Sequence, residues 1–212
     1  MKPGRLAADR FTPKTVELSE CNGFEIQLRG RGRIRALDAV LTREDVMKLF
    51  QAARDARDRV ILACGLVGLR ASEIGALRRG MVDVAEAVID LPSGAVKGGK
   101  RRGRGRRVPF GSIRLVSEIL TAFFVLEESV RLDRVSIFRR VKRMARAAGI
   151  PRPVTVHGLR ATAATLFAQA GYSVLALQEH FGWSAIRTAE HYIRAAGISA
   201  IEEMKAKGGA IL

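Results

Sequence analysis

The sequence predicts a mainly helical α+β fold with one small antiparallel β-sheet. From residue 41 onward apolar residues recur at helical spacing in most segments, and only two short segments have the character of strands. Aromatic residues make up 6% of the chain, so the core depends on Ala, Leu, Val and Ile, a mixture that suits helices. A content of 48% hydrophobic and 27% charged residues is typical of a folded globular protein.

Residues 1–38 differ in character from the rest of the chain. Gly, Pro and Arg are scattered through them, the segment 24–28 reads as a strand, and the basic tract 29–33 lies near their end. We therefore predict an N-terminal arm or short subdomain over 1–38, followed by one mainly helical domain over 39–212.

The first half of the domain is predicted to contain three helices and both strands. Thr42 is the expected N-cap of the first helix, because Asp45 lies three residues later, where its carboxylate completes a capping box. Val46 and Leu49 then follow at helical spacing. The other predicted elements are helices over 58–64 and 72–77 and strands over 87–91 and 107–110.

The second half is predicted to be helical throughout. Gly149 and Gly171 are expected to end two of its helices, since glycine readily adopts the left-handed conformation that follows a helix. Ser184 is the expected N-cap of a later short helix. The predicted helices span residues 112–124, 133–148, 156–170, 174–180, 185–190 and 199–207.

The charge balance indicates a polyanionic partner. There are 37 Lys and Arg residues against 21 Asp and Glu residues, a formal net charge of +16, and nucleic acid would relieve the self-repulsion. Two cysteines, Cys21 and Cys64, are too few for a disulfide framework. No segment resembles a signal peptide or reaches the roughly 20 apolar residues of a membrane span. We expect a cytoplasmic protein with no membrane partner.

Two short motifs contain groups suited to binding an anion. His157 and Arg160 of H-G-L-R project from one side of a predicted helix, about 60° apart and away from its apolar face. Arg70, in G-L-R-A-S-E-I, comes directly before a predicted helix, near free backbone amides, and Glu73 is placed to hold it. Taken alone, His157 and Arg160 are equally consistent with ordinary surface residues, whereas Arg70 and Glu73 alone slightly favour a structural ion pair.

The connection between the two strands is strongly basic. Seven of the eleven residues in 97–107 are Lys or Arg and none is acidic, a density that suits contact with phosphate. Residues 94–100 also match G-x-x-x-x-G-K, but Arg101 replaces the Ser or Thr of a nucleotide-binding loop, which argues against an NTPase. The predicted DNA contacts are Lys97, Lys100, Arg101, Arg102, Arg104, Arg106 and Arg107.

The segment 180–192 contains the only tryptophan of the chain and one of its two tyrosines. Trp183 lies nine residues before Tyr192, and a short helix is predicted between them, so both side chains are expected in one pocket. For a single tryptophan taken alone, a place in the core is the more common role.

Together these elements resemble the catalytic domain of the tyrosine recombinases, the family of phage integrases and chromosome-dimer resolvases. Four features occur in the family's order over about residues 40–200. They are the motif G-L-R-x-S-E-I, a lysine after a strand, the motif H-x-x-R, and G-W followed by Tyr. The resemblance implies that Glu73 supports the first arginine and that Lys100 is the alternative to Lys97. The implied catalytic residues are Arg70, Lys97, His157, Arg160, Trp183 and Tyr192.

The resemblance also implies a mechanism and partners. Tyr192 would cleave one strand of double-stranded DNA through a 3′-phosphotyrosine link, while the arginines bind the phosphate and the lysine protonates the leaving oxygen. No cofactor or metal is implied, and the three histidines lack the spacing of a zinc site. The family implies a homotetramer on paired sites, a monomer or dimer when free, and association with the nucleoid.

Two departures from the family pattern bear on these expectations. Residues 1–38 are too few for the core-binding domain that integrases usually carry, so the chain resembles minimal recombinases or a catalytic fragment. Ala161 stands where a second histidine is common.

Two alternative functions fit the sequence less well than site-specific recombination. The H-x-x-R motif and Trp183 argue against a type IB topoisomerase-like enzyme. The complete set of catalytic residues argues against a non-catalytic DNA-binding regulator on the same scaffold.

Overall fold

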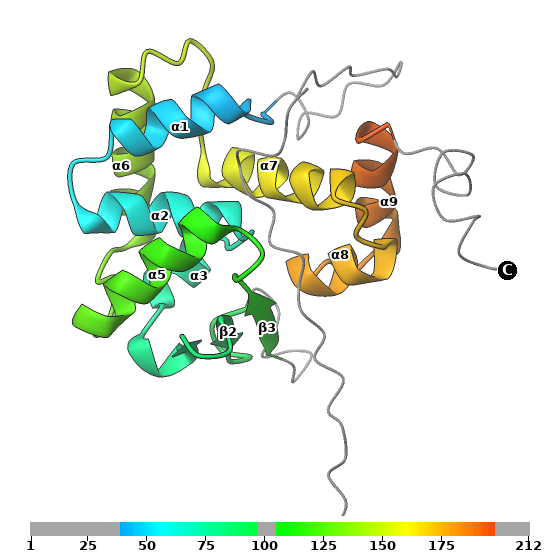
Figure 1. The fold of residues 1–212 in the computed structure, drawn as a ribbon, viewed down its shortest axis with the longest axis horizontal. Coiled ribbons are helices and arrows are strands. Elements are labelled where there is room, and N and C mark those ends of the chain that lie inside the picture. The colour runs from blue at the N-terminus through cyan, green and yellow to red at the C-terminus, as the bar shows by residue number, and fades with distance from the viewer. Residues whose placement is uncertain (1–38, 97–104, 198–212) are drawn as a thin grey trace, which may run out of the picture.

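The computed structural model describes residues 39–96 and 105–197, and it confirms a mainly helical fold with one small sheet (Figure 1). Helices lie before and after a sheet of three short antiparallel strands in the order β1-β2-β3. The elements in chain order are α1 (Arg43–Gln51), α2 (Ala56–Leu66), α3 (Ala71–Ala76), the 3-10 turn η1 (Arg79–Met81), β1 (Val82–Asp83), β2 (Val88–Leu91), β3 (Arg106–Pro109), α5 (Arg114–Leu126), α6 (Arg134–Ala147), α7 (Val156–Gln169), α8 (Val174–Phe181) and α9 (Ile186–Ala195).

Helix α2 lies at the centre of the packing. Every residue from Val60 to Leu66 is buried, and the helix packs against α5, α6 and α7 (Figure 1). An apolar surface on all sides suits a helix enclosed by others. The sheet packs against α8 through β3, with Ile89 of β2 paired to Val108 of β3. The C-terminal part of α2 packs closely on α7, because a Cβ at Gly65 would lie 2.8 Å from the Leu159 side chain.

At the N-termini of several helices, the side chain of the N-cap residue accepts a hydrogen bond from a backbone amide of the first turn. Thr42 accepts a hydrogen bond from the Asp45 amide and Asp45 accepts one from the Thr42 amide, both at 3.1 Å, so the predicted capping box is confirmed. The cap predicted at Ser184 is wrong, because the residue before α9 is Ala185, which makes no side-chain cap hydrogen bond. Helix α9 also continues past the predicted end at residue 190, so Tyr192 lies within it.

The strands differ from prediction at their boundaries. β3 begins at Arg106 rather than 107, and the two-residue strand β1 was not predicted because so short a segment has no periodicity to detect. The strand predicted over 24–28 and the helix predicted over 199–207 lie outside the described residues.

A buried carboxylate connects α2 to α6. Asp58 is fully buried and forms ion pairs with Arg140, at 2.8 Å, and with Arg143. Arg140 also pairs with Asp55, the N-cap of α2.

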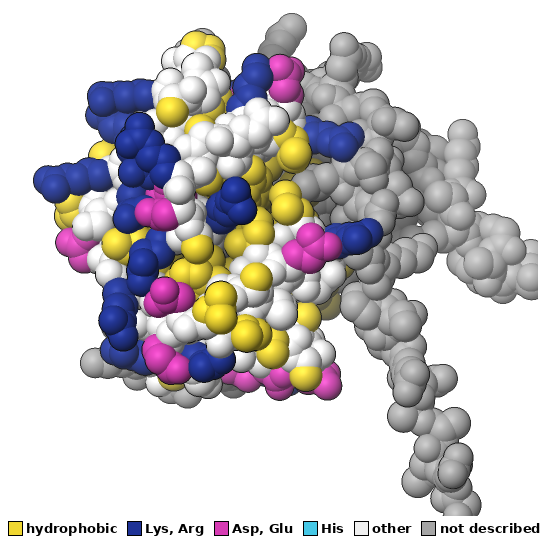
Figure 2. Space-filling model, turned by 60° about the vertical axis from the view of Figure 1, so that its left-hand side comes forward, with side chains coloured by type: hydrophobic (Ala, Val, Ile, Leu, Met, Phe, Trp, Pro, Cys, Tyr) yellow, Lys and Arg dark blue, Asp and Glu magenta, His cyan; other side chains and the backbone are white. Residues whose placement is uncertain are grey.

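Figure 2 shows many Lys and Arg side chains on one face of the described residues, with Asp and Glu side chains among them. Part of the positive charge is thus neutralised locally.

None of the helices among the described residues is long and apolar enough to cross a membrane.

Replacing Thr42 by Ala is expected to lower the free energy of unfolding by about 1 kcal/mol, because the first turn of α1 loses its side-chain acceptor. Ser184→Ala is the matched control, since Ser184 is exposed and lies outside α9, and its effect should stay within about 0.5 kcal/mol. Urea unfolding measures both. Equal effects of the two substitutions would contradict the capping role of Thr42.

Candidate active site

The turn before α3 presents Arg70 beside a buried carboxylate. Gly68 has a φ of +85°, and a Cβ there would lie 2.3 Å from the Phe181 ring, so the position requires glycine. Glu73 is fully buried and accepts hydrogen bonds from the backbone amide and Nη1 of Arg70, both at 2.8 Å. Glu73 therefore holds Arg70 in place, as the sequence predicts.

Arg160 is buried near the start of α7. Its guanidinium donates hydrogen bonds to the backbone carbonyls of Gly68 and Phe181. The guanidinium carbon lies 5.1 Å from the centroid of the Phe181 ring and 5.9 Å from that of Trp183. The expectation that Arg160 projects away from the core is wrong, because α8 and α9 also pack against α7.

Electrostatic coupling joins His157, Arg160 and Arg70. Burial, together with the positive charges of Arg70 and Arg106, lowers the pKa of Arg160 to about 9. Burial and the charges of Arg160 and Arg70 likewise lower the pKa of His157, so its imidazole is neutral at pH 7. His157 and Arg160 lie three residues apart in α7, and Arg160 donates to the carbonyl of Gly68, two residues before Arg70.

Tyr192 lies in a stack of aromatic rings. Its ring is parallel to that of Trp183, with an interplanar angle of 1° and centroids 5.2 Å apart, and Trp183 stacks in turn on Phe181. Tyr192 is 5% exposed. Burial raises the pKa of its phenol, although the charge of Arg160 acts in the opposite direction. The structure therefore brings Trp183 and Tyr192 together, as their spacing predicts.

Arg106 does not lie where the sequence predicts. A DNA contact was expected, but the guanidinium forms a 2.7 Å ion pair with the buried Glu73, so its charge already has a carboxylate partner, which argues against a contact with phosphate. The alternation of inward-facing and outward-facing residues along β3 could have indicated from the sequence that Arg106 faces the core. Residues 106, 108 and 110 share one face, and Val108 and Phe110 are fully buried.

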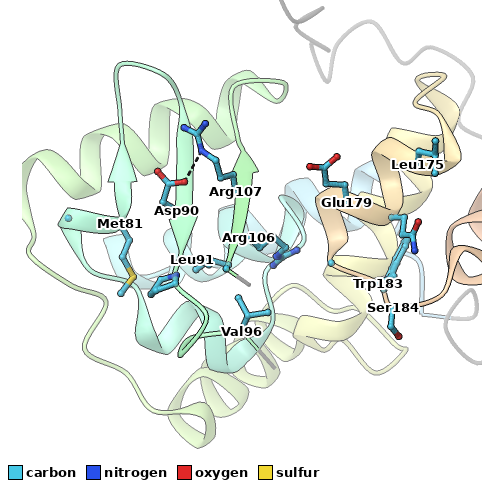
Figure 3. Close-up of a pocket in the computed structure, with 15 residues that line it drawn as sticks. Met81, Asp90, Leu91, Val96, Arg106, Arg107, Leu175, Glu179, Trp183 and Ser184 are labelled. Atoms are coloured by element: carbon cyan, nitrogen blue, oxygen red, sulfur yellow. Dashed lines mark hydrogen bonds and ion pairs between the residues drawn. The ribbon is translucent and has the colours of Figure 1, made fainter. Parts of the chain in front are cut away.

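The remaining basic residues of the connection fall into two groups. Arg107 points away from the core, as Figure 3 shows, and pairs with Asp90 at 2.8 Å on the surface. It stays a predicted DNA contact. The predicted catalytic lysine and its alternative, which were also predicted DNA contacts, lie outside the described residues, as do three further predicted DNA contacts. These residues are Lys97, Lys100, Arg101, Arg102 and Arg104.

His180 is a further residue of this site that sequence reasoning did not single out. Its Nε2 lies 2.9 Å from the Val67 carbonyl, and its ring packs edge-on against Phe167. Burial lowers the pKa of His180 to about 4, with smaller contributions from the charges of Arg106 and Arg160. The neutral ring thus connects α8 to the residue that precedes Gly68. Nothing in the sequence distinguishes it from an ordinary helix histidine.

The free energy of unfolding is expected to fall as the pH is lowered from about 6.5 toward 4, because unfolded His180 binds a proton that the folded site excludes. Its contribution to stability is fully present above pH 6.5 and changes by at most about 1.4 kcal/mol per pH unit. Urea unfolding across this range should show a smaller slope in His180→Gln. Identical slopes in both proteins would show that His180 is not responsible.

A cavity of about 1130 Å³ lies between the sheet and α8. Figure 3 shows Arg106, Glu179 and Trp183 along it, so it borders the ring stack. Among the described residues, His, Cys, Asp and Glu side chains form no cluster that could hold a metal ion.

Comparisons with known proteins show the family and the fold of the chain. Residues 39–197 match the model of the phage integrase family. Tyrosine recombinase XerA of Thermococcus kodakarensis is 30% identical over 176 residues, which cover 76% of this chain and 59% of that protein. The chain thus spans about three fifths of that relative's length.

Two solved structures have the same fold. A crystal structure of XerA recombinase gives a TM-score of 0.64 at 21% identity, covering 86% of this chain and 67% of the other. The catalytic domain of bacteriophage HP1 integrase gives 0.58 at 22% identity, covering 79% of this chain and 93% of the other.

Proposed function

Because the chain belongs to the phage integrase family, we propose that it is a tyrosine recombinase that cuts and rejoins double-stranded DNA through Tyr192. One observation carries the proposal. The buried phenol of Tyr192 stacks on Trp183, and the Arg160 guanidinium lies 5.9 Å from the Trp183 ring and donates to the carbonyl of Gly68, two residues before Arg70. Two guanidiniums next to a phenol suit attack on a phosphodiester.

The cleavage step uses these side chains in distinct roles. The phenol oxygen of Tyr192 bonds to phosphorus, the bond from phosphorus to the 5′ oxygen breaks, and the 3′ phosphate stays on the protein. His157 is neutral and accepts the phenol proton. A lysine, Lys97 or Lys100, protonates the departing 5′ oxygen. Rejoining reverses the step with a 5′ hydroxyl as the nucleophile.

The arginines stabilise the charge that develops on the non-bridging oxygens of the phosphate. A guanidinium has five N–H donors, and in Arg160 two hydrogen bonds go to the carbonyls of Gly68 and Phe181. We propose that the remaining donors bind the phosphate while these two contacts hold the group in place. Arg70 is held by Glu73 and is 27% exposed, so DNA can reach it.

We further propose the partners and the place of action. The net charge of +16 supports binding to DNA. We propose a homotetramer on paired DNA sites, a monomer or dimer when free, and action at the nucleoid in the cytoplasm. Arg107 and the basic residues of 97–104 would contact the DNA backbone.

Trapping on a nicked DNA substrate tests the proposal. The wild-type protein is incubated with a pool of randomised duplexes that carry a nick, so that the short 5′-hydroxyl fragment diffuses away after cleavage. We expect an adduct that survives denaturation and maps by mass to Tyr192, and sequencing of the trapped DNA gives the recognition site. Relaxation of supercoils without strand exchange would indicate a topoisomerase, and specific binding without an adduct would indicate a regulator.

A further inference from the structure

Arg106 joins three elements that are far apart in the sequence. Its Nη2 donates a hydrogen bond to Glu73 at 2.7 Å, and its Nη1 donates one to the His180 carbonyl at 2.6 Å. Figure 3 shows the side chain reaching from β3 toward α8. One buried guanidinium therefore connects β3, α3 and α8.

The contact with Glu73 affects Arg70. Glu73 Oε2 accepts from both the Arg70 amide and Arg106, while Oε1 accepts from the Arg70 guanidinium. Glu73 is fully buried, so its negative charge requires close positive partners. Without Arg106 the carboxylate keeps only one of its two guanidinium partners, and its orientation toward Arg70 is less constrained.

The contact with His180 affects the segment that leads to the nucleophile. The His180 carbonyl belongs to the last turn of α8, where free carbonyls and the helix dipole favour a cation. Gly182 follows with a φ of +59°, and a Cβ there would lie 2.9 Å from Arg106 Cδ. The turn therefore packs directly on the arginine side chain. The next residue is Trp183, which stacks on Tyr192.

On the basis of the recombinase function proposed above, we propose that Arg106 is a positioning residue of the cleavage site. It fixes Glu73, and through it Arg70, relative to the turn that carries Trp183 and supports Tyr192. Its guanidinium is planar and reaches two acceptors at once, which the single ammonium of lysine cannot do in the same geometry. This role replaces the direct phosphate contact expected from the sequence.

The test separates the rate of cleavage from DNA affinity in Arg106→Gln and Arg106→Lys. Single-turnover adduct formation at saturating DNA should slow by about 10- to 100-fold in Arg106→Gln, the usual effect of removing a group that orients a functional residue. Arg106→Lys keeps the charge and the aliphatic chain, so it should fold and give a smaller loss. The dissociation constant and its salt dependence should stay at wild-type values in both variants.

Two other arginines serve as comparisons. Arg107→Gln should give the opposite pattern, with weaker binding and a salt slope reduced by about 1. Arg79→Gln removes an exposed ion pair with Glu128 and should change neither quantity. Thermal unfolding of each variant sets a measuring temperature at which all are folded.

The outcomes distinguish this inference from the proposed function. If the wild-type protein forms no Tyr192 adduct, the recombinase function itself fails. If the wild type forms the adduct and folded Arg106→Gln cleaves at the same rate, only the positioning role fails. A loss confined to affinity, with a smaller salt slope, would return Arg106 to phosphate contact. If Arg106→Gln does not fold, full activity in Arg106→Lys overturns the proposal.

Discussion

Tyr192→Phe is expected to abolish the covalent protein–DNA complex and to leave DNA affinity unchanged. The substitution removes only the hydroxyl oxygen that would bond to phosphorus, because phenylalanine retains the ring that stacks on Trp183 at 5.2 Å. Fold and stacking should therefore persist. The measurement is trapping on the nicked substrate under denaturing conditions, together with an equilibrium binding titration of the same variant.

The chain offers a matched control in its second tyrosine. The Tyr172 hydroxyl donates a hydrogen bond to Ser112 at 3.2 Å, and its ring packs against Phe167. Tyr172→Phe should therefore form the adduct at close to the wild-type rate. An adduct that persists in Tyr192→Phe and disappears in Tyr172→Phe would reassign the nucleophile to Tyr172.

Arg70→Gln is expected to slow cleavage at saturating DNA by about 100- to 1000-fold, equivalent to roughly 2.7–4 kcal/mol. The reason is the loss of one of the two guanidiniums that we propose stabilise the charge developing on the phosphate. Arg70 is a better choice than Arg160 for this experiment, because the buried Arg160 also holds two backbone carbonyls. Single-turnover adduct formation measures the effect.

Arg79→Gln is the appropriate reference for Arg70→Gln as well, because it removes a guanidinium that pairs with Glu128 at the surface. We expect its cleavage rate to equal that of the wild type. A similar loss in both variants would mean that overall positive charge, rather than the position of Arg70, determines the rate. A near-normal rate in Arg70→Gln alone would leave Arg160 as the main phosphate ligand.

Local sequence signals predicted much of the fold for identifiable reasons. Thr42 and Asp45 lie three residues apart, and a capping box depends only on such short-range contacts. The contact of Glu73 with Arg70 has the same spacing and was also predicted. The start of α9 was missed because Ser184 is a favourable cap by residue type, whereas the helix begins after Ala185.

The sequence by itself determined the kinds of side chain at the candidate site, their order along the chain and the family they indicate. Those properties depend on identity and spacing, which the linear chain carries completely. Strand alternation could have indicated that Arg106 faces the core, but only the tertiary structure decided which groups the two buried arginines contact. Both Arg106 and Arg160 donate hydrogen bonds to carbonyls at the C-terminal end of α8. Those acceptors are 74 and 21 residues away in the sequence, so only packing brings them within reach.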